Sequence, residues 1–399
     1  MDKPISTDRL EQATLAAQAP VWIDNIDDLE IAANIWQSAP LLAIDTEFIR
    51  ERTYRATLGL VQIANTEHVW LLDMPKLGKA EALAKVLGNP QVMKVLHSGS
   101  EDLEILLQEL HTPIKNLFDT QVGAAILGNA LQMGYARLIE SLFDIHLPKG
   151  ETRSNWLARP LSQEQTLYAA NDVAYLILAA ECLISQLQQR QRWDWLQQDM
   201  LSILAKANQK PPTDKLYLRV RGAGNISVEA LSQLQKLANW RDTAAQYENK
   251  PRSFIMKDEL LLILAEIPIS EMNELALKRS NILTYKQYKR YSTALLEVLQ
   301  QPVHKPPDPI PGRMEGIQLL QIQALKKLIA KQAQILEIEP AVLSSRRILE
   351  AKLHAKQSGE KWFDGWRGVL LNAHIESIMR ASSQELTFMI ESNEYALST

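Results

Sequence analysis

The stretch LLAIDTEF at residues 41–48 joins an apolar run to two carboxylates two positions apart, Asp45 and Glu47. The apolar run indicates a buried strand, and the two-residue period of a strand turns both acids to one face. Two charged carboxylates about 4 Å apart repel each other by roughly 4 kcal/mol at an effective dielectric constant near 20. The pair therefore favours a bound cation, with two solvated acids at an exposed strand end as the alternative.

The surrounding sequence predicts an α/β domain. Apolar, β-rich runs at 41–44, 58–64 and 68–74 are separated by short polar turns, which indicates three consecutive strands with hairpin-like connections. A helix over about 79–87, a strand over 92–96, and helices from about residue 101 through 189 follow. This order of strands and helices is typical of a sheet covered by helices.

A second acidic motif is VLHSGSEDLEIL at 95–106, which predicts a strand, a turn and a helix whose first turn carries Asp102. The helix dipole by itself favours an acid in a first turn, so a purely structural role for Asp102 stays open at this point. His97 lies at the strand end beside the turn. We expect it to pack or to stabilise the turn rather than to take part in catalysis.

A third motif, SQEQTLYAANDVAYLIL at 162–178, opens with the capping-box pair Ser162 and Gln165. The helix that this box begins places Tyr168 and Asp172 four positions apart, on one face. Asp172 stands among apolar residues, where burial of a carboxylate is costly unless it is paired or bound to a metal. A functional role is therefore expected for Asp172.

In this order and spacing, DTEF, HSGSEDLEIL and YAANDVAYL resemble the three exonuclease motifs of the DEDD superfamily, and its ribonuclease D subgroup best. The similarity continues through LGLVQIA, FDTQ at 118–121 and ETRSNWLARPLSQEQ. A tyrosine four residues before Asp172 marks the tyrosine branch, because the histidine branch would place its residue at Leu167. The resemblance implies a ribonuclease H-like DEDD exonuclease domain, with a mixed sheet flanked by helices.

The rest of the chain reads as two all-α bundles, because no convincing strand pattern follows Leu216. ALSQLQKLANWRDTAAQYENKPRSFIMKDELLLILA resembles the HRDC domain, and SSRRILEAKL with GWRGVLL looks like a second copy. Trp240 and Trp366 fall at core-like positions and are expected to pack. Proline-rich breaks lie at Pro211 and Pro212 and at 302–311. The predicted domains are an exonuclease domain at 1–210, HRDC domains at 215–300 and 313–395, and a linker at 301–312.

The charge is uneven along the chain. The net charge of −4 divides into −9 over residues 1–214, +4 over 215–300 and +1 over 301–399. An acidic half joined to a mildly basic part suits a carboxylate-rich metal site next to a phosphate-binding surface. The residues predicted to bind nucleic acid, with a solvated helix face as the alternative for each, are Arg219, Arg221, Lys236, Arg241, Lys250, Arg252 and Lys257.

The single cysteine, Cys182, lies in an apolar helical pattern and is expected to be a buried packing thiol. A disulfide framework or thiolate zinc site within the chain is excluded, so a reducing cytoplasm fits best. No stretch approaches the roughly 18 apolar residues that a membrane span needs, and the N-terminus lacks the pattern of a signal peptide. We therefore expect a cytoplasmic protein that is soluble, not exported and without a membrane partner.

Four carboxylates and a phenol suit oxygen-preferring Mg²⁺ or Mn²⁺ rather than zinc. Two ions about 4 Å apart would serve phosphodiester hydrolysis. By resemblance, Asp45 should bridge both ions, Glu47 and Asp172 should complete the shell of one, and Asp102 should support the other, through water. Tyr168 should orient the attacking water, a role that suits a phenol with an ordinary pKa near 10 better than that of general base.

The resemblance further implies a 3′-to-5′ exoribonuclease that releases nucleoside 5′-monophosphates from structured RNA 3′ ends, above all those of transfer RNA precursors. It implies no obligate protein partner. The residues alone do not distinguish RNA from DNA, so a DNA 3′-to-5′ exonuclease is one alternative. A catalytically inactive adaptor that only binds nucleic acid is another, and the presence of all four acids and the tyrosine speaks against it.

Overall fold

The computed structural model describes residues 5–148, 150–151, 154–209, 213–279, 282–302, 306–308, 310, 314–355 and 361–392. The chain forms two compact units. The first contains Met1–Ile49, Leu58–Gln209 and Met314–Thr399, and the second contains Arg50–Thr57 and Lys210–Arg313. Pro211, Pro212 and half of the linker predicted at 301–312 lie outside the described residues.

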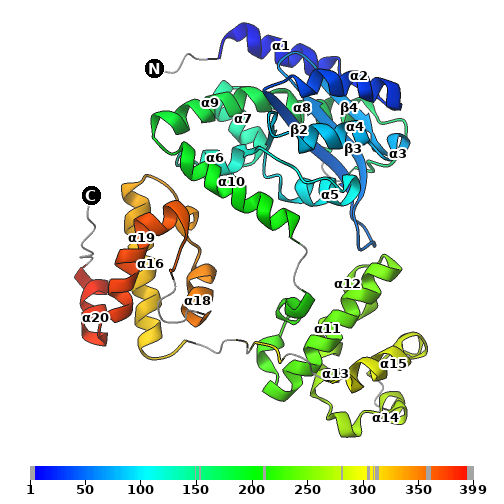
Figure 1. Ribbon diagram of the computed structural model, residues 1–399, viewed down its shortest axis with the longest axis vertical. Coiled ribbons are helices and arrows are strands. Elements are labelled where there is room, and N and C mark those ends of the chain that lie inside the picture. The colour runs from blue at the N-terminus through cyan, green and yellow to red at the C-terminus, as the bar shows by residue number, and fades with distance from the viewer. Residues whose placement is uncertain are drawn as a thin grey trace. The chain divides into compact units, whose positions relative to one another are not determined.

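The first unit is built on a six-stranded sheet with strand order β1-β4-β3-β2-β5-β6. Figure 1 shows β2, β3 and β4 of this sheet among the helices of the unit. The strands are β1 Val21–Ile23, β2 Leu41–Ile49, β3 Thr57–Ala64, β4 Val69–Asp73, β5 Met93–Leu96 and β6 Leu117–Asp119. β3 and β4 pair antiparallel, whereas β1 with β4, β2 with β5, and β5 with β6 pair parallel. The sheet is therefore mixed, which confirms the expected fold class.

Two of these strands were not predicted. β1 and β6 each span three residues, which is too short to show a repeating pattern of burial along the sequence. They form the two edges of the sheet. β2, in contrast, runs five residues beyond the predicted strand at 41–44, so that Asp45 and Glu47 lie inside the strand rather than at its end.

Helices cover the sheet and connect its strands. Their bounds are α1 Thr7–Gln18, α2 Ile26–Gln37, α3 Met74–Leu77, α4 Glu81–Gly88, α5 Ser100–Leu110, α6 Thr120–Ile126, α7 Tyr135–Phe143, α8 Gln163–Ala174, α9 Leu176–Gln189 and α10 Trp193–Asn208. α8 packs against β2 and β4, and α9 packs against β2 and β5. The third motif therefore lies directly on the strand that carries the first.

The helical stretch Gln163–Gln189, which contains α8 and α9, is long and apolar enough by composition to cross a membrane. This corrects the expectation that no stretch of the chain reaches that composition. Within the fold, 61% of its most apolar window is buried. Its apolar character is that of a core helix covering a sheet on one side and packing against other helices on the other.

The C-terminal helices of the first unit are α16 Ile317–Ile335, α17 Pro340–Leu343, α18 Arg346–Ala355, α19 Gly365–Arg380 and α20 Ser383–Ser392. They pack around α16, and α19 among them packs on α10. Trp195 of α10 and Trp366 of α19 stack with ring centroids 4.4 Å apart and planes at 2°. Arg367 donates to both carboxylate oxygens of Asp199, at 2.5 and 2.9 Å. The packing role expected for Trp366 is confirmed, and α19 is held on α10 by both stacking and charge.

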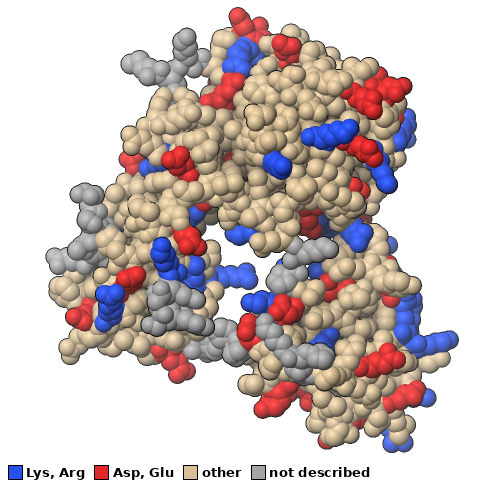
Figure 2. All heavy atoms as spheres, viewed as in Figure 1, with Lys and Arg blue, Asp and Glu red and all other residues tan. Residues whose placement is uncertain are grey.

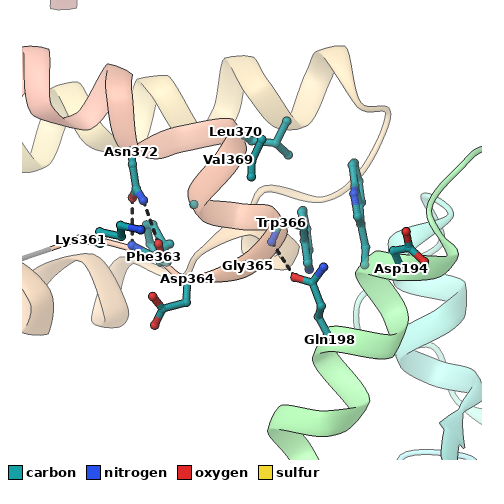
Figure 3. Close-up of a pocket in the computed structure, with 12 residues that line it drawn as sticks. Asp194, Gln198, Lys361, Phe363, Asp364, Gly365, Trp366, Val369, Leu370 and Asn372 are labelled. Carbon is teal, nitrogen blue, oxygen red and sulfur yellow. Dashed lines mark hydrogen bonds between the residues drawn. The ribbon is translucent and has the colours of Figure 1, made fainter.

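Beside this contact, a surface cavity of about 720 Å³ is lined in part by Trp195, Gln198 and Trp366 (Figure 3). The Gln198 side-chain oxygen accepts a hydrogen bond from the backbone N–H of Trp366 at 2.8 Å. This bond satisfies one of the N–H groups that have no partner inside the first turn of α19.

Over its described residues from Thr213 onward, the second unit consists of helices joined by turns and loops. Its elements are η1 Thr213–Arg219, η2 Ala223–Asn225, α11 Val228–Glu248, α12 Arg252–Ile255, α13 Asp258–Glu266, η3 Ile269–Glu271, α14 Glu274–Arg279 and α15 Tyr285–Gln300. Leu234, Leu237 and Leu261 are fully buried in its core. Trp240 packs against this core and meets Tyr291 edge to face at 5.5 Å, which confirms its packing role.

The segment Arg50–Thr57, which connects β2 and β3, belongs to the second unit. The Tyr54 hydroxyl donates to Asp242 at 3.0 Å and accepts from Arg252 at 2.9 Å. The side-chain oxygen of Asn249, at the end of α11, accepts from the backbone N–H groups of Tyr54 and Arg55, each at 3.1 Å. This segment therefore packs against α11 and α12 as part of their fold.

Candidate active site

β2 presents Asp45 and Glu47 on one face of the sheet, as its period requires. Both are partly exposed, whereas Ile44 and Thr46 between and before them are buried. The Thr46 hydroxyl donates a short hydrogen bond to the carboxylate of Asp102. The residue between the two acids of β2 thus holds the acid of α5 in place.

The turn that leads into α5 is built around Asp119, at the end of β6. One carboxylate oxygen of Asp119 accepts from the backbone N–H of Ser98 at 3.1 Å, and the other accepts from that of Gly99 at 2.9 Å. The first oxygen also accepts from the N–H groups of Gln121 and Val122, which caps α6. Ser98 has φ +58°, a conformation that these bonds compensate. Asp119 therefore fixes the turn that brings Asp102 to the sheet.

His97 has the structural role that its position predicts. Its Nδ1 lies 2.9 Å from the Thr120 hydroxyl, and its Nε2 lies 2.9 Å from the carbonyl oxygen of Met133. Burial lowers the pKa of His97, which favours the neutral ring. Both ring nitrogens are used inside the fold, so His97 links the α5 turn to the segment before α7.

α8 places Tyr168 and Asp172 one turn apart. The predicted capping box is present, with the Ser162 hydroxyl accepting from the Gln165 N–H and the Gln165 side chain accepting from the Ser162 N–H. The hydrogen bond from Tyr168 lowers the pKa of Asp172, but burial outweighs it and raises that pKa to about 7. The phenol and the carboxylate thus act on each other directly.

The four acids influence one another electrostatically. Burial raises the pKa of Asp45 well above its ordinary range, and the charges of Asp102, Asp172 and Glu47 raise it further. Burial, followed by the charges of Asp172 and Asp102, raises the pKa of Glu47 to about 9. The pKa of Asp102 is also raised, mainly by burial. Together with the Thr46–Asp102 hydrogen bond and the packing of α8 on β2, this places the four predicted carboxylates within electrostatic reach of one another, and their catalytic roles stay predictions.

This donor set suits a hard divalent cation. Carboxylate oxygens are the ligands that Mg²⁺ and Mn²⁺ prefer, and a dication would offset the repulsion that raises these pKa values. Among the residues that the structure describes, no three His, Cys, Asp or Glu side chains already lie close enough together to chelate one ion. The fit rests on the chemistry of the donors and on their shared electrostatics.

Three residues near this site were not singled out from the sequence. The Tyr135 hydroxyl donates to the carbonyl oxygen of Asn171 at 3.1 Å, and burial and the charge of Asp172 raise the pKa of Tyr135. Trp156 lies beside Tyr168, with ring centroids 6.1 Å apart. Arg159 follows in the same segment. Trp156 and Arg159 lie in a loop with no periodic pattern; the family resemblance covers this loop, but their partners come from the contacts of the fold.

The basic residues predicted to bind nucleic acid divide into two groups, and the first is engaged within the fold. Arg241 is only 5% exposed and donates to the Met256 carbonyl and to Asp258, so the prediction of a phosphate contact there is wrong. The Arg241 side chain can be buried on α11 because its guanidinium forms an ion pair with Asp258 inside the unit.

Three further residues of this group also have internal partners. Lys236 donates to the carbonyl oxygens of Leu299 and Gln301, which makes it a cap for the end of α15. Lys250 pairs with Glu248 at 2.8 Å, and Arg252 pairs with Asp242 at 2.5 Å. These contacts use donors that a phosphate would need.

Arg219, Arg221 and Lys257 form the second group and are exposed. None of the three takes part in an ion pair within the described part of the chain. The backbone N–H of Arg221 donates to Asp258, the residue next to Lys257, so these two cations lie near each other. On the face that Figure 2 shows, Lys and Arg side chains lie interspersed with Asp and Glu.

Comparison with known proteins agrees with this geometry. A family model described as 3′-5′ exonuclease matches residues 20–188, and the HRDC domain model matches residues 230–299. Ribonuclease D of Pseudomonas paraeruginosa is 32% identical over 360 residues, covering 87% of this chain and 94% of the relative. Ribonuclease D of Xanthomonas oryzae pv. oryzae is 32% identical over 367 residues, covering 91% and 99%.

A solved structure shows the same likeness over nearly the full length. The crystal structure of Escherichia coli RNase D, described as an exoribonuclease involved in structured RNA processing, superposes with a TM-score of 0.80 at 27% identity. The match covers 91% of this chain and 99% of that one. With the motifs on β2, α5 and α8, these relatives show that the chain belongs to the ribonuclease D family of 3′-to-5′ exoribonucleases.

Proposed function

We propose that this chain trims the 3′ ends of transfer RNA precursors and other structured RNAs at a site that holds two divalent ions, Mg²⁺ or Mn²⁺. Members of the family act on RNA and generally use divalent metals. The observation that carries the proposal is that Thr46 of β2 donates to Asp102 of α5 and that α8, with Asp172, packs on β2. The acids of these elements raise one another's pKa values, and a bound dication would offset that repulsion.

The four carboxylates would hold the ions through their oxygens, and at neutral pH Asp172 and Glu47 would release protons as the ions bind. Bound ions would lower the pKa of a water nucleophile and offset the charge on the leaving 3′ oxygen. The released product would then be a nucleoside 5′-monophosphate.

Tyr168 contributes a neutral hydroxyl. Burial raises its pKa, and the charges of Asp172, Glu47 and Asp45 raise it further, so the phenol stays protonated at neutral pH. A phenol with so high a pKa is a poor general base, and it serves by accepting and donating hydrogen bonds. Its place beside Asp172 suits it to orient the attacking water.

The site is tested by release of 5′-mononucleotides from a 3′-extended transfer RNA and from a matched DNA strand, with Mg²⁺ or Mn²⁺ added. Asp172→Ala should abolish release, and Tyr168→Phe should weaken it. Asp24→Asn is the matched control, because Asp24 pairs with Lys76 on the surface and its loss should leave the rate unchanged. Release that is equal with and without metal would overturn the two-metal site.

The same assay decides between the proposed substrate and its alternatives. Preferential trimming of the RNA strand supports processing of precursor transfer RNA, whereas faster trimming of DNA would make the protein a DNA exonuclease. Retention of the 3′ extension on both strands, with binding intact, would leave an adaptor that only holds nucleic acid. We also propose that the protein acts in the cytoplasm, which the single cysteine, Cys182, supports.

A further inference from the structure

Arg159, in the loop before α8, uses all five N–H donors of its guanidinium inside the fold. Nε and Nη2 donate to the two carboxylate oxygens of Asp73, at 2.8 and 3.0 Å. Nη2 also donates to the carbonyl oxygen of Gly59 at 2.8 Å. Nη1 donates to the carbonyl oxygens of Trp156 and Ala158, at 2.9 and 2.8 Å. A guanidinium has five N–H donors, so none is left for a phosphate.

The acceptors of Arg159 come from three places: β3, the end of β4, and the loop itself. Asp73 is only 1% exposed, and a buried carboxylate with a bidentate arginine partner is a strong, directional link. The arginine therefore ties the backbone of Trp156 and Ala158 to the sheet. We call Arg159 with these four acceptor residues the Arg159 clamp.

β3 accommodates this loop at a single glycine. A Cβ atom added to Gly59 would lie 2.5 Å from the carbonyl oxygen of Trp156, closer than side chains approach backbone. The close approach of loop and strand thus depends on Gly59, and it brings the Trp156 carbonyl within reach of Arg159. The Arg159 clamp and Gly59 therefore both determine where the backbone carbonyl of Trp156 lies.

The side chain of Trp156 connects this part of the loop to Tyr168 of the candidate site. Trp156 is only 1% exposed, and its ring lies 6.1 Å from that of Tyr168 with the planes tilted by 36°. Aromatic pairs at such a separation interact favourably and constrain each other's orientation. Its Nε1 has no hydrogen-bond partner in the described part of the chain, so packing and the clamp locate the indole.

Arg159 also lies three residues before Ser162, the N-cap of α8. The clamp thus fixes the chain just ahead of the helix, and the capping box fixes the helix start. Tyr168 lies in the second turn of α8. The position of Tyr168 is therefore set by α8, and its ring also contacts Trp156.

We propose that Trp156 and Arg159 are positioning residues for Tyr168, with Trp156 fixing the orientation of the phenol and Arg159 fixing Trp156. This inference rests on the proposed catalytic role of Tyr168. Trp156 is buried and Arg159 uses its donors inside the fold, so we assign neither a contact with substrate. Their effect on the reaction runs through the Tyr168 hydroxyl and disappears when that hydroxyl is absent.

A double-mutant cycle tests this dependence, using the full-length protein with Mn²⁺ and a 3′-extended transfer RNA. Trp156→Leu should lower kcat roughly 10- to 100-fold, because small misplacements of a catalytic group cost about this much, while KM changes less. In the Tyr168→Phe background, the same substitution should lower kcat by less than about threefold. An equal loss in both backgrounds would show that Trp156 acts independently and would overturn the proposal.

Trp36→Leu is the matched control. Trp36 is also fully buried with an unpartnered Nε1, but it lies on α2 and packs edge to face on Trp70, at 5.5 Å. Its substitution should lower the melting temperature as much as Trp156→Leu does, with kcat unchanged. If both variants lose kcat in proportion to stability, Trp156 is only a core residue. Trp156→Phe serves in the same cycle if Trp156→Leu fails to fold.

Arg159→Lys tests the clamp itself. Lysine keeps the charge opposite Asp73 but has three donors instead of five, so it cannot also hold the carbonyls of the loop. Its kcat should fall in the wild-type background and barely change in the Tyr168→Phe background. Arg9→Lys is the control, because Arg9 forms a bidentate pair with Glu181 away from Tyr168 and its loss should not affect kcat. A wild-type kcat for Arg159→Lys would refute the clamp, whereas a wild-type kcat for Tyr168→Phe alone would refute the proposed function.

Discussion

The hydroxyl of Thr46 donates a hydrogen bond to the carboxylate of Asp102, which joins the first acidic motif to the second. This bond lowers the pKa of Asp102 against the larger effect of burial, which raises it. Thr46 is buried on β2 and its neighbours on both sides are acids of the site. A residue with no charge of its own thus supports the charged form of Asp102.

Thr46→Val keeps the shape of the side chain and removes this donor. The pKa of Asp102 should rise, so the acidic limb of the pH profile of kcat/KM should move to higher pH. A hydrogen bond to a charged group is worth about 1.5–3 kcal/mol, which corresponds to a loss of roughly tenfold or more in kcat/KM near neutral pH. Thr243→Val is the control, since the Thr243 hydroxyl donates only to Asn239 within α11. An unshifted acidic limb would contradict the role of Thr46.

Metal-free protein should lose stability as the pH rises. The pKa of Asp172 is about 7 against an ordinary value of 3.8, and that of Glu47 is about 9 against 4.5. The folded form therefore binds these protons more tightly than the unfolded form, and its free energy of unfolding falls between about pH 4 and pH 9. We expect the melting temperature in chelator to be several degrees lower at pH 8 than at pH 5.5.

Asp172→Asn removes one of the repelling charges and isolates this effect from other titrating groups. In chelator, this variant should melt above the wild type at pH 8 and show a flatter dependence on pH. Added Mg²⁺ or Mn²⁺ should raise the wild-type melting temperature more at pH 8 than at pH 5.5, because the ions compete with protons. A wild type that is equally stable at both pH values in chelator would contradict the prediction.

Local patterns were sufficient to predict the site wherever a regular element carries it. The strand period placed Asp45 with Glu47, and the helical spacing after the Ser162 cap placed Tyr168 with Asp172. The meeting of these elements follows from the pairing and packing of β2, α5 and α8, which no single motif specifies. The family resemblance supplied that arrangement.

The features that were missed depend on contacts between distant residues. β1 and β6 are too short to show a period, and they are strands because β4 and β5 pair with them. Arg159 stands in a loop, and its partner Asp73 lies 86 residues away. The sequence around Arg241 is that of a surface helix. Its burial follows from the ion pair with Asp258, 17 residues further along the chain, which no local pattern predicts.

The link between α10 and the C-terminal helices gives a third prediction. Arg367→Met removes the bidentate pair with Asp199 and the donation to the Val342 carbonyl. Hydrogen exchange should then quicken across α16–α20 and α10, while the sheet stays protected. Arg380→Met is the control on the same helix, because Arg380 is exposed and pairs only with Glu376 one turn away. Equal exchange in both variants would show that stacking of Trp195 on Trp366 is sufficient.

The exposed cations of the second unit give the last prediction. Replacing Arg219, Arg221 and Lys257 together by alanine should raise KM for RNA and flatten its dependence on salt, by about one unit of log–log slope per lost phosphate contact. The change should leave the melting temperature near that of the wild type, since all three are exposed.

Arg241→Ala is the informative comparison for that variant. Its side chain is 7% exposed and its partner Asp258 would be left without its arginine, so we expect a loss of about 3 kcal/mol in the stability of the second unit. The folded fraction of the Arg241→Ala variant should show the wild-type slope of KM against salt, because the Arg241 side chain is buried and does not contact phosphate. If the exposed triple variant keeps the wild-type slope as well, the phosphates are bound elsewhere, and the first unit becomes the main RNA-binding surface.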